Sequence, residues 1–554
     1  MLSFKFYKAL YFSFFILIIC IAVTLRSDEV QISTENVLNA EKVIGLQFNE
    51  AERDSMLDNL NDFLANYQYI RNTNLSNTIP PAVLFNPIPV GFKFETEQRP
   101  VRFSDYSNTK FLGKIENLAF YSIGELAELI RTKQISSVEL TKFFLERLKK
   151  YGPVLHSVIT LTEERALKHA ELMDKEITSG KYRGILHGIP FGVKDLLATK
   201  DYKTTWGAAP FKDQKINEDA TVIKKLEDAG AVLIAKLTMG ALAMGDVWFG
   251  GKTRNPWDTT KGSSGSSAGS ASSVSAGLVP FAIGTETWGS IVSPSTVCGT
   301  TGLRPTYGRV SRTGAMALSW SMDKIGPICR SAEDLAIVFN AIYGPDGIDQ
   351  TLYDVPFNYS PEVDLSKLKI GYLKKDFDKS YDFHDNDSLA LEKLRELGAQ
   401  LIPIKLPDIN VNDLAFVLSA ETGAVFDELT RSNRDDLLVR QIKDAWPNVF
   451  RSSRFIPAVE YLNANRVRYL LIQKMQELMN NIDVYVAPSW EGDNLLLTNL
   501  TGHPCVVLPD GFSTDGTPTS ITFMGKLFDE GRLIAVAKKY QDATDFHKKH
   551  PPFN

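Results

Sequence analysis

Hydrophobic and polar residues alternate along most of this chain in two patterns, one typical of helices and one of buried strands. Apolar residues recur at helical spacing over residues 49–67, which predicts an amphipathic helix. Residues 220–228 also have helical spacing, and the apolar run 231–235 follows as a predicted buried strand. Strand, helix and strand patterns return between residues 368 and 403. This alternation predicts an α/β fold, in which helices cover both faces of a mainly parallel or mixed sheet.

Two further helices have clearly encoded first turns. Ser122 is followed by Glu125, and Ser136 is followed by Glu139, so each serine and glutamate can satisfy the free backbone donors of a helix start. We expect the second of these helices to end at Gly152-Pro153, because proline interrupts helical hydrogen bonding.

The N-terminus has a different composition. Residues 9–25 carry no charge and follow Lys5 and Lys8, which is the layout of a secretory signal or a membrane anchor. Its 17 uncharged residues lie at the lower limit of a spanning helix, so cleavage and anchoring both stay open. We therefore expect an exported or membrane-anchored protein whose catalytic domain lies on the extracytoplasmic side.

These patterns divide the chain into three predicted regions. Residues 1–27 are the signal peptide or N-terminal membrane anchor, and residues 28–110 are an accessory helical segment followed by a proline-rich linker. Residues 111–554 are the main domain, which is long enough to bury a substantial core.

Composition excludes several classes of protein. The 61 Lys and Arg residues nearly balance the 66 Asp and Glu residues, so charge gives no reason to expect a nucleic-acid partner. The four cysteines are too scattered for a disulfide scaffold or a Cys-x-x-Cys zinc site: Cys20, Cys298, Cys329 and Cys505. We expect neither a metal nor a cofactor.

The most unusual segment is the Gly/Ser tract at residues 261–273. Such tracts are usually flexible linkers. Here a compact apolar run, residues 278–283, follows closely, and a second turn of small polar residues comes after it at residues 284–290. Because core-forming residues stand so close to both turns, we interpret the tract as part of a folded active-site region.

At these motifs the sequence resembles the amidase-signature family, over roughly residues 118–551. The matching segments are, in chain order, Leu186-His187-Gly188-Ile189-Pro190-Phe191-Gly192-Val193-Lys194-Asp195, the Gly/Ser tract, Gly284-Thr285-Glu286, Gly289-Ser290-Ile291, Gly302-Leu303-Arg304-Pro305 and Asn499-Leu500-Thr501-Gly502-His503-Pro504. The resemblance implies an α/β/α sandwich with a large mixed β-sheet. It also implies an amidase that hydrolyses a carboxamide through a serine acyl-enzyme and releases ammonia or an amine.

The resemblance assigns roles to three side chains. Ser290 is the implied nucleophile, Lys194 the base, and Ser266 the hydroxyl between them, following a cis peptide bond. Two Gly-Ser-Ser triplets compete for the middle position, and Gly265-Ser266-Ser267 aligns the downstream residues without gaps. A lysine acts as a base only when it is neutral, and burial lowers its pKa.

An amide carbonyl also needs donors for the oxyanion that forms on attack. The implied donors are the backbone amides of Thr287, Trp288, Gly289 and Ser290, and the implied supporting residues are Ser267, Glu286, Asp195 and Arg304. The family usually has glycine at position 288 and aspartate at position 286. A bulky residue disfavours positive φ, so Trp288 puts the usual shape of this loop in question.

Three alternatives stay open. Gly265-Ser266-Ser267-Ala268-Gly269 also fits the nucleophile elbow of α/β-hydrolases with Ser267 as nucleophile, although the polar residues 259–264 do not predict the strand that this motif requires. The glutaminase-type subunit of a tRNA-dependent amidotransferase shares the same motifs. A non-catalytic binding protein of the same fold is the third, prompted by Trp288. We expect a small-molecule amide substrate, and the sequence leaves its identity and the oligomeric state open.

Overall fold

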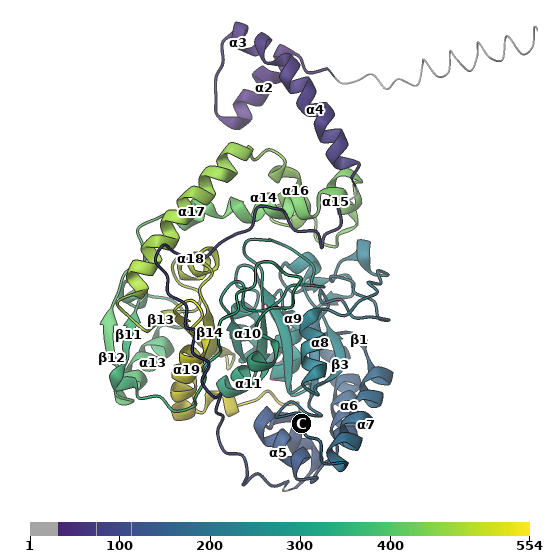
Figure 1. The fold of residues 1–554 in the computed structure, drawn as a ribbon, viewed down its shortest axis with the longest axis vertical. Helices are drawn as coiled ribbons and strands as arrows, with labels where there is room; N and C mark the ends of the chain where they lie inside the picture. Colours follow the sequence, from purple (N-terminus) through teal and green to yellow (C-terminus); the bar gives the residue numbers. More distant parts are fainter. Residues whose placement is uncertain (1–30, 74, 112, 554) are drawn as a thin grey trace, which may run out of the picture. The chain divides into compact units, whose positions relative to one another are not determined.

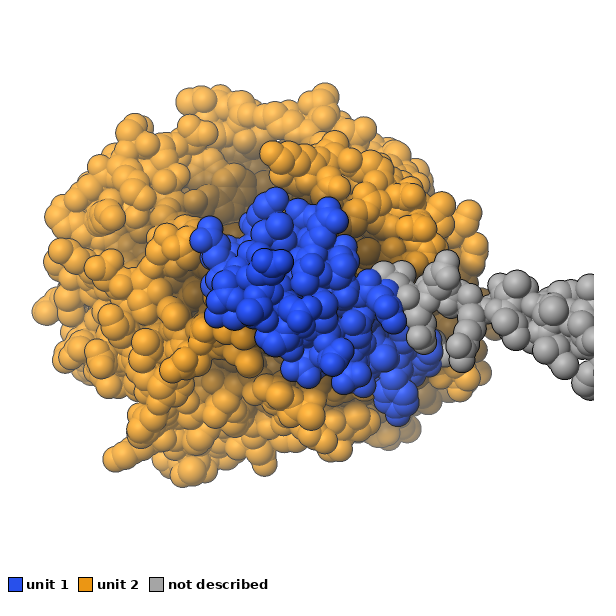
Figure 2. Space-filling model, turned by 90° about the horizontal axis from the view of Figure 1, so that it is seen from above, with its two compact units in different colours: residues 1–76 blue, residues 77–554 orange. Residues whose placement is uncertain are grey.

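The computed structural model describes residues 31–73, 75–111 and 113–553. The predicted signal or anchor segment, residues 1–27, therefore lies outside the described residues. The chain divides into two compact units, residues 1–76 and residues 77–554 (Figure 2). The sequence-based boundaries at residues 27 and 110 stay predictions.

The described part of unit 1 is helical. It contains α2 (Thr34–Ile44), α3 (Glu50–Ser55) and α4 (Leu57–Arg71). Arg53 pairs with the buried carboxylate of Glu41 at 2.7 Å and thereby ties α3 to α2. The single helix predicted over residues 49–67 is divided at Met56, which keeps right-handed backbone angles. Because the backbone of Met56 stays in the helical region, the apolar spacing continues across the junction. The sequence pattern therefore does not show the break.

Unit 2 is built on an eleven-stranded mixed sheet (Figure 1). In spatial order its strands are β1 (Val158–Leu161), β3 (Val232–Leu237), β2 (Pro190–Lys194), β8 (Phe281–Glu286), β10 (Lys324–Cys329), β9 (Thr301–Arg304), β14 (Cys505–Phe512), β15 (Pro518–Gly525), β13 (Val484–Pro488), β11 (Lys369–Tyr372) and β12 (Gln400–Pro403). β2 runs parallel to both β3 and β8, whereas β10 runs antiparallel to β8 and β9. The predicted α/β fold with a large mixed sheet is confirmed.

Unit 2 also contains helices, some of which pack against this sheet and others on one another. They are α5 (Ile123–Arg131), α6 (Ser137–Leu155), α7 (Glu163–Thr178), α8 (Thr221–Asp228), α9 (Ala268–Ser275), α10 (Val292–Cys298), α11 (Ala332–Ile342), α12 (Lys374–Phe377), α13 (His384–Glu396), α14 (Phe416–Val425), α15 (Asp427–Arg431), α16 (Trp446–Ser453), α17 (Ala458–Met479), α18 (Asn494–Thr501) and α19 (Glu530–Thr544). α9 contacts β8, β2 and β3, and α19 contacts β14 and β15. Every residue of β2, β3 and β8 is buried.

The predicted helix starts agree with the structure. Ser122 and Ser136 cap α5 and α6, and in each case the expected glutamate completes the capping box. The predicted end of α6 at Gly152-Pro153 is wrong, because the helix continues to Leu155. Pro153 lies in the last turn, so the hydrogen bond that its missing N–H removes is close to the end of the helix. His156 ends the helix in a left-handed conformation.

Strand ends in the middle of the sheet determine where the sequence motifs meet. β2 ends on Lys194, and the parallel neighbour β8 ends on Glu286 and runs directly into residues 287–290. The Gly/Ser tract runs from the end of β7 (Asp258–Gly262) through a turn into α9, which packs on β8 and β2. The tract is therefore part of the folded domain, and its turn lies at the same edge of the sheet as the ends of β2 and β8.

Candidate active site

The amine of Lys194 lies at the centre of this edge and is fully buried. Its Nζ donates to the hydroxyls of Ser266 and Thr285, each at 2.8 Å, and to Ser267 Oγ at 3.1 Å. Burial lowers the pKa of Lys194 to about 7, although the charges of Asp323 and Glu286 oppose this shift. The amine is therefore surrounded by hydroxyls and can lose its proton near neutral pH.

Ser266 occupies the turn between β7 and α9 and is almost fully buried. The peptide bond before it, Gly265–Ser266, is cis, in keeping with the family resemblance. A Cβ atom on Gly265 would lie 1.9 Å from the carbonyl oxygen of Gly245, so only glycine fits at this position. The backbone of the loop before β4 (Val247–Trp248) thus packs directly against the turn that carries Ser266.

Ser290 lies beside the same turn. Its carbonyl oxygen accepts a hydrogen bond from the backbone N–H of Ser267 at 3.2 Å. The residue is 8% exposed, whereas Lys194 is not exposed at all. The structure therefore brings Ser290, Ser266 and Lys194 together, with the serine at position 290 nearest to solvent.

Residues 287–290 form a short loop between β8 and α10. Within the described part of the chain, none of the four backbone N–H groups of this loop donates a hydrogen bond. Gly289 has φ +88°, whereas Trp288 does not adopt a positive φ and is 42% exposed. The left-handed position thus falls on the glycine, and Trp288 does not distort the loop. The arrangement offers free backbone donors next to Ser290.

The carboxylate of Glu286, the last residue of β8, binds the backbone that follows this loop. Its Oε2 accepts the backbone N–H groups of Ile291 and Val292 at 2.8 and 2.9 Å, and its Oε1 accepts from Arg304 and Asn499 at 2.8 and 2.9 Å. Burial would raise the pKa of Glu286, but the Arg304 guanidinium and the amide donors outweigh it and lower this pKa. Because Glu286 directly precedes residues 287–290 and its side chain binds the backbone directly after them, it fixes the loop.

Arg304 and Asp195 are supporting residues that lie away from the hydroxyls of Ser266 and Ser290. Arg304 is fully buried and also donates to the carbonyl oxygen of His503 at 3.0 Å, so it joins Glu286 to the C-terminal motif. Asp195 forms a buried ion pair with Lys236 at 3.0 Å and accepts from the N–H of Thr205 at 2.8 Å. Neither residue contacts Ser266 or Ser290, so each supports the backbone around the site.

Sequence reasoning gave Thr285 no role, although its hydroxyl is one of the nearest partners of Lys194. The residue belongs to the motif Gly284-Thr285-Glu286, but the face of β8 that it occupies depends on how β8 packs between its neighbours.

Asp323 is a second carboxylate that binds the loop of residues 287–290, because its Oδ1 accepts a hydrogen bond from Thr287 Oγ1 at 2.5 Å. Its Oδ2 accepts from the backbone of Leu318 and Ser319.

The gathered groups are an amine, hydroxyls, carboxylates and free amides. Among the residues that the structure describes, no three His, Cys, Asp or Glu side chains lie close enough to hold a metal ion. The chemistry that these groups support directly is nucleophilic attack by a serine whose proton passes to a neutral amine.

Comparisons with known proteins point the same way. The family model described as Amidase matches residues 139–494. The A subunit of glutamyl-tRNA(Gln) amidotransferase from Coxiella burnetii (strain Dugway 5J108-111) is 34% identical over 478 residues, which cover 78% of this chain and 99% of that protein. The protein of the same name from Acinetobacter baumannii (strain AB0057) is 35% identical over 483 residues, which cover 77% and 97%. The solved peptide amidase from Stenotrophomonas maltophilia has a TM-score of 0.69 and 28% identity over 78% of this chain and 98% of its own.

The prediction of an exported or membrane-anchored location is wrong. It is contradicted by the relatives, which are named as subunits of a glutamyl-tRNA(Gln) amidotransferase. Residues 31–73, 75–111 and 113–553 include no helix whose length and apolar character would let it cross a bilayer. The segment on which the prediction rested, residues 9–25, lies outside the described residues. Its 17 uncharged residues are at the lower limit for a span, and apolar composition alone does not specify a destination.

Proposed function

This chain belongs to the amidase-signature family and is an amidase that hydrolyses carboxamides, and we propose that Ser290 is its nucleophile, with Ser266 and Lys194 as the proton path. The observation that carries the proposal is the fully buried Lys194 amine, 2.8 Å from Ser266 Oγ, with a pKa lowered to about 7. A base must be unprotonated to accept a proton, and a pKa of about 7 leaves roughly half of this amine unprotonated at neutral pH.

In the proposed first step, Ser290 Oγ attacks the carbonyl carbon of the amide. Its proton passes to Ser266 Oγ, while Ser266 passes its own proton to Lys194 Nζ. The tetrahedral intermediate then collapses as the proton returns along the same path to the leaving amine. Water attacks the resulting acyl-enzyme by the reverse sequence, and the carboxylic acid is released. Ser266 Oγ and Lys194 Nζ lie 2.8 Å apart, and Ser290 is joined to the turn that carries Ser266 through the hydrogen bond from Ser267 N–H to its carbonyl oxygen, so no distant base is required.

The proposed oxyanion donors are the backbone amides of residues 287–290. Donors that are already fixed stabilise the developing charge without reorganising during the reaction. Two carboxylates hold this loop: Glu286 through the backbone of Ile291 and Val292, and Asp323 through the hydroxyl of Thr287. Thr285 and Ser267 are proposed to accept hydrogen bonds from Lys194 and so orient its amine toward Ser266.

The direct test uses Ser290→Ala and a panel of amides that includes a peptide C-terminal amide, an aryl amide and free glutamine. Wild-type protein is expected to release ammonia or amine from at least one substrate and to react covalently with a fluorophosphonate probe. Ser290→Ala is expected to lose both signals, whereas Ser293→Ala, a nearby serine in α10, serves as the matched control. Full labelling of Ser290→Ala would reject Ser290 as the nucleophile.

A second candidate is the glutaminase component of a tRNA-dependent amidotransferase. It is favoured by the relatives of that name, which align over 97% to 99% of their own length. Such a component would hydrolyse glutamine and pass the ammonia to partner subunits. Glutamine hydrolysis that rises when a co-purifying partner is present would support this candidate, while efficient turnover of peptide or aryl amides by the isolated chain would count against it.

A further inference from the structure

Residues 312–323 form a loop, called here the bracket loop, that contacts two parts of the candidate site: the segment after Lys194 and the loop of residues 287–290. Near its start, Ala198 N–H donates to the carbonyl oxygen of Gly314 at 2.8 Å, and Met316 N–H donates to Leu196 O at 3.0 Å. Leu196 lies two residues after Lys194. At its end, Asp323 accepts the Thr287 hydroxyl. One loop therefore touches both the segment that follows the proposed base and the loop that carries the proposed oxyanion donors.

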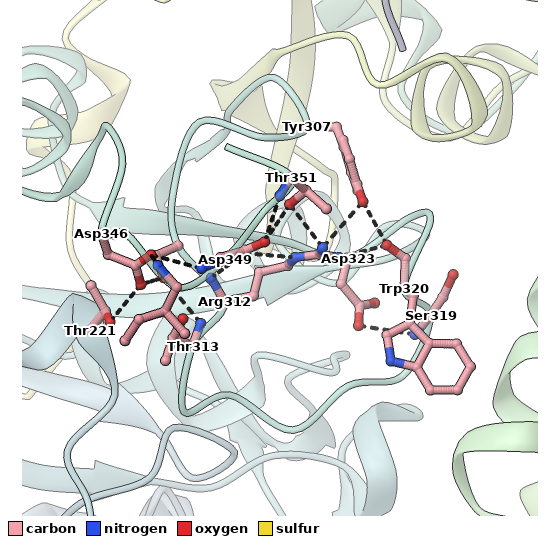
Figure 3. Close-up of polar contacts among 12 residues, drawn as sticks. Thr221, Tyr307, Arg312, Thr313, Ser319, Trp320, Asp323, Asp346, Asp349 and Thr351 are labelled. Atoms are coloured by element: carbon pink, nitrogen blue, oxygen red, sulfur yellow. Dashed lines mark hydrogen bonds and ion pairs between the residues drawn. The ribbon is translucent and has the colours of Figure 1, made fainter. Parts of the chain in front are cut away.

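The outer parts of the bracket loop are firmly anchored. Arg312 donates to the carbonyl oxygen of Trp320 at 2.7 Å, to Thr351 Oγ1 at 3.0 Å and to Tyr307 Oη at 3.2 Å, and it pairs with Asp349 (Figure 3). On the side of α14, the buried carboxylate of Glu421 accepts the hydroxyls of Ser319 and Ser321. None of these contacts involves Ala317, which lies in the middle of the loop.

A single side chain from far away in the sequence holds that middle. Asn77 Nδ2 donates to Ala317 O at 3.1 Å, and Asn77 Oδ1 accepts from Ala317 N–H at 2.8 Å. The carboxamide thus satisfies both backbone polar groups of one residue, as a neighbouring strand would. The next two backbone N–H groups of the bracket loop, those of Leu318 and Ser319, donate to Asp323.

We propose that Asn77 is a positioning residue for amide hydrolysis, because it clamps the bracket loop and so sets where Asp323 holds Thr287 and the oxyanion loop. Asn77 is the first residue of unit 2 and precedes the residues that the family model matches, 139–494. The clamp is therefore supplied by the N-terminal extension of this chain. The inference rests on the function proposed above for Ser290, Ser266 and Lys194.

The test compares Asn77→Ala with wild type and with Asn72→Ala, a matched change at an exposed residue near the end of unit 1. Loss of two backbone hydrogen bonds is expected to lower kcat by about 10-fold, while KM changes little. The pH profile is a second readout. Asp323 and Glu286 are the charged groups that raise the pKa of Lys194, so a loosened Asp323 is expected to move the midpoint of kcat/KM to lower pH. Asn77→Asp, which keeps the acceptor for Ala317 N–H, is expected to recover part of kcat.

A double-mutant cycle with Thr287→Val tests through which residues Asn77 affects the site. If Asn77 acts through Asp323 and Thr287, the two substitutions together are expected to lower kcat by less than the product of their separate effects. Wild-type kcat in Asn77→Ala would overturn the inference. So would a loss of kcat that multiplies with that of Thr287→Val and leaves the pH midpoint unchanged, which would indicate a merely structural role. If Ser290→Ala also retains activity, the proposed function itself fails, which separates the two outcomes.

Discussion

At the scale of single residues, the site depends on the protonation state of one amine. Among the residues that the structure describes, Lys194 has hydroxyl partners and no carboxylate in hydrogen-bond contact. A carboxylate at that distance would hold the ammonium form and suppress its function as a base. Burial against hydroxyls has the opposite effect, because it disfavours the charge and still satisfies the amine.

This environment makes a prediction for pH dependence. The active form of Lys194 is unprotonated and its pKa is lowered to about 7, so kcat/KM is expected to rise as pH increases through about 7 and then to level. Lys194→Ala is expected to lower kcat by about 100- to 10,000-fold, the usual contribution of a general base. Steady-state kinetics between pH 5 and pH 9 check both, and a profile that falls through neutral pH would contradict a lysine base.

Thr285 provides a second residue-scale prediction. Thr285→Val removes one acceptor of the Lys194 amine at almost constant shape, so kcat is expected to fall by about 5-fold for one lost hydrogen bond. The ammonium form loses a partner as well, and the midpoint of the pH profile is expected to move to lower pH. Thr285→Ser keeps the hydroxyl and is the control; identical behaviour of the two variants would exclude the orienting role.

At the scale of elements, the loop of residues 287–290 is fixed from its flanks. Glu286 at the end of β8 binds the first backbone amides of α10, and Arg304 at the end of β9 neutralises it. Both side chains are fully buried. A buried ion pair gains little stability over a well-packed apolar pair, but loss of one partner leaves a buried charge.

Glu286→Gln is therefore expected to destabilise unit 2 by about 3 to 5 kcal/mol, because it leaves Arg304 without its counter-charge. It is also expected to lower kcat, since the single oxygen of the amide cannot accept both from the backbone of Ile291 and Val292 and from Arg304 and Asn499. Urea unfolding and kinetics measure the two effects. Glu95→Gln, in an exposed pair with Arg99, is the control and is expected to leave stability almost unchanged, because an exposed ion pair contributes little. An equal effect of both substitutions would contradict the argument.

At the scale of the whole molecule, the order of strands assembles residues that are distant in the sequence. β2, β8, β10 and β9 are successive neighbours, and β14 follows β9. Lys194, Glu286 and Arg304 end their strands in this part of the sheet, and the segment before β14 brings the C-terminal motif to Arg304. The candidate site thus requires the strands to assemble in this order.

Elsewhere in unit 2, a buried pair of carboxyl groups joins α13 to the sheet. Burial and the nearby charge of Asp510 in β14 raise the pKa of Asp387 in α13 to about 10, and burial raises that of Asp510. Tyr381 Oη donates to Asp387 Oδ2 at 2.8 Å, and Thr519 Oγ1 donates to Asp510 Oδ1 at 2.7 Å. Glu491 and Tyr540 are the other titratable groups nearby.

The pair predicts how stability depends on pH. A folded-state pKa above the unfolded value means that the folded state binds more protons, so the free energy of unfolding is expected to decrease as pH rises from about 4 toward 10. Asp387→Asn is expected to flatten this dependence, because the amide donates to Asp510 without needing a proton. Denaturant unfolding at several pH values checks this, with the exposed neighbour Asp385→Asn as control. An unchanged slope in Asp387→Asn would contradict it.

The sequence by itself determined the parts of this protein that depend on local interactions. The capping boxes at Ser122 and Ser136 encoded two helix starts, the apolar run at residues 231–235 encoded β3, and the ordered motifs carried the family and the α/β class. Hydrogen bonding within a turn and burial of one face act over a few residues, so they can be read from the chain.

Only the tertiary structure decided which side chains meet. Thr285 reaches Lys194 because of the face that it occupies on β8, whereas Asp195, the next residue along the chain from that lysine, faces Lys236 instead. The contact between Asn77 and Ala317 spans 240 positions. No local pattern specifies such pairs, since strand order and register are set by the packing of the whole sheet and its helices.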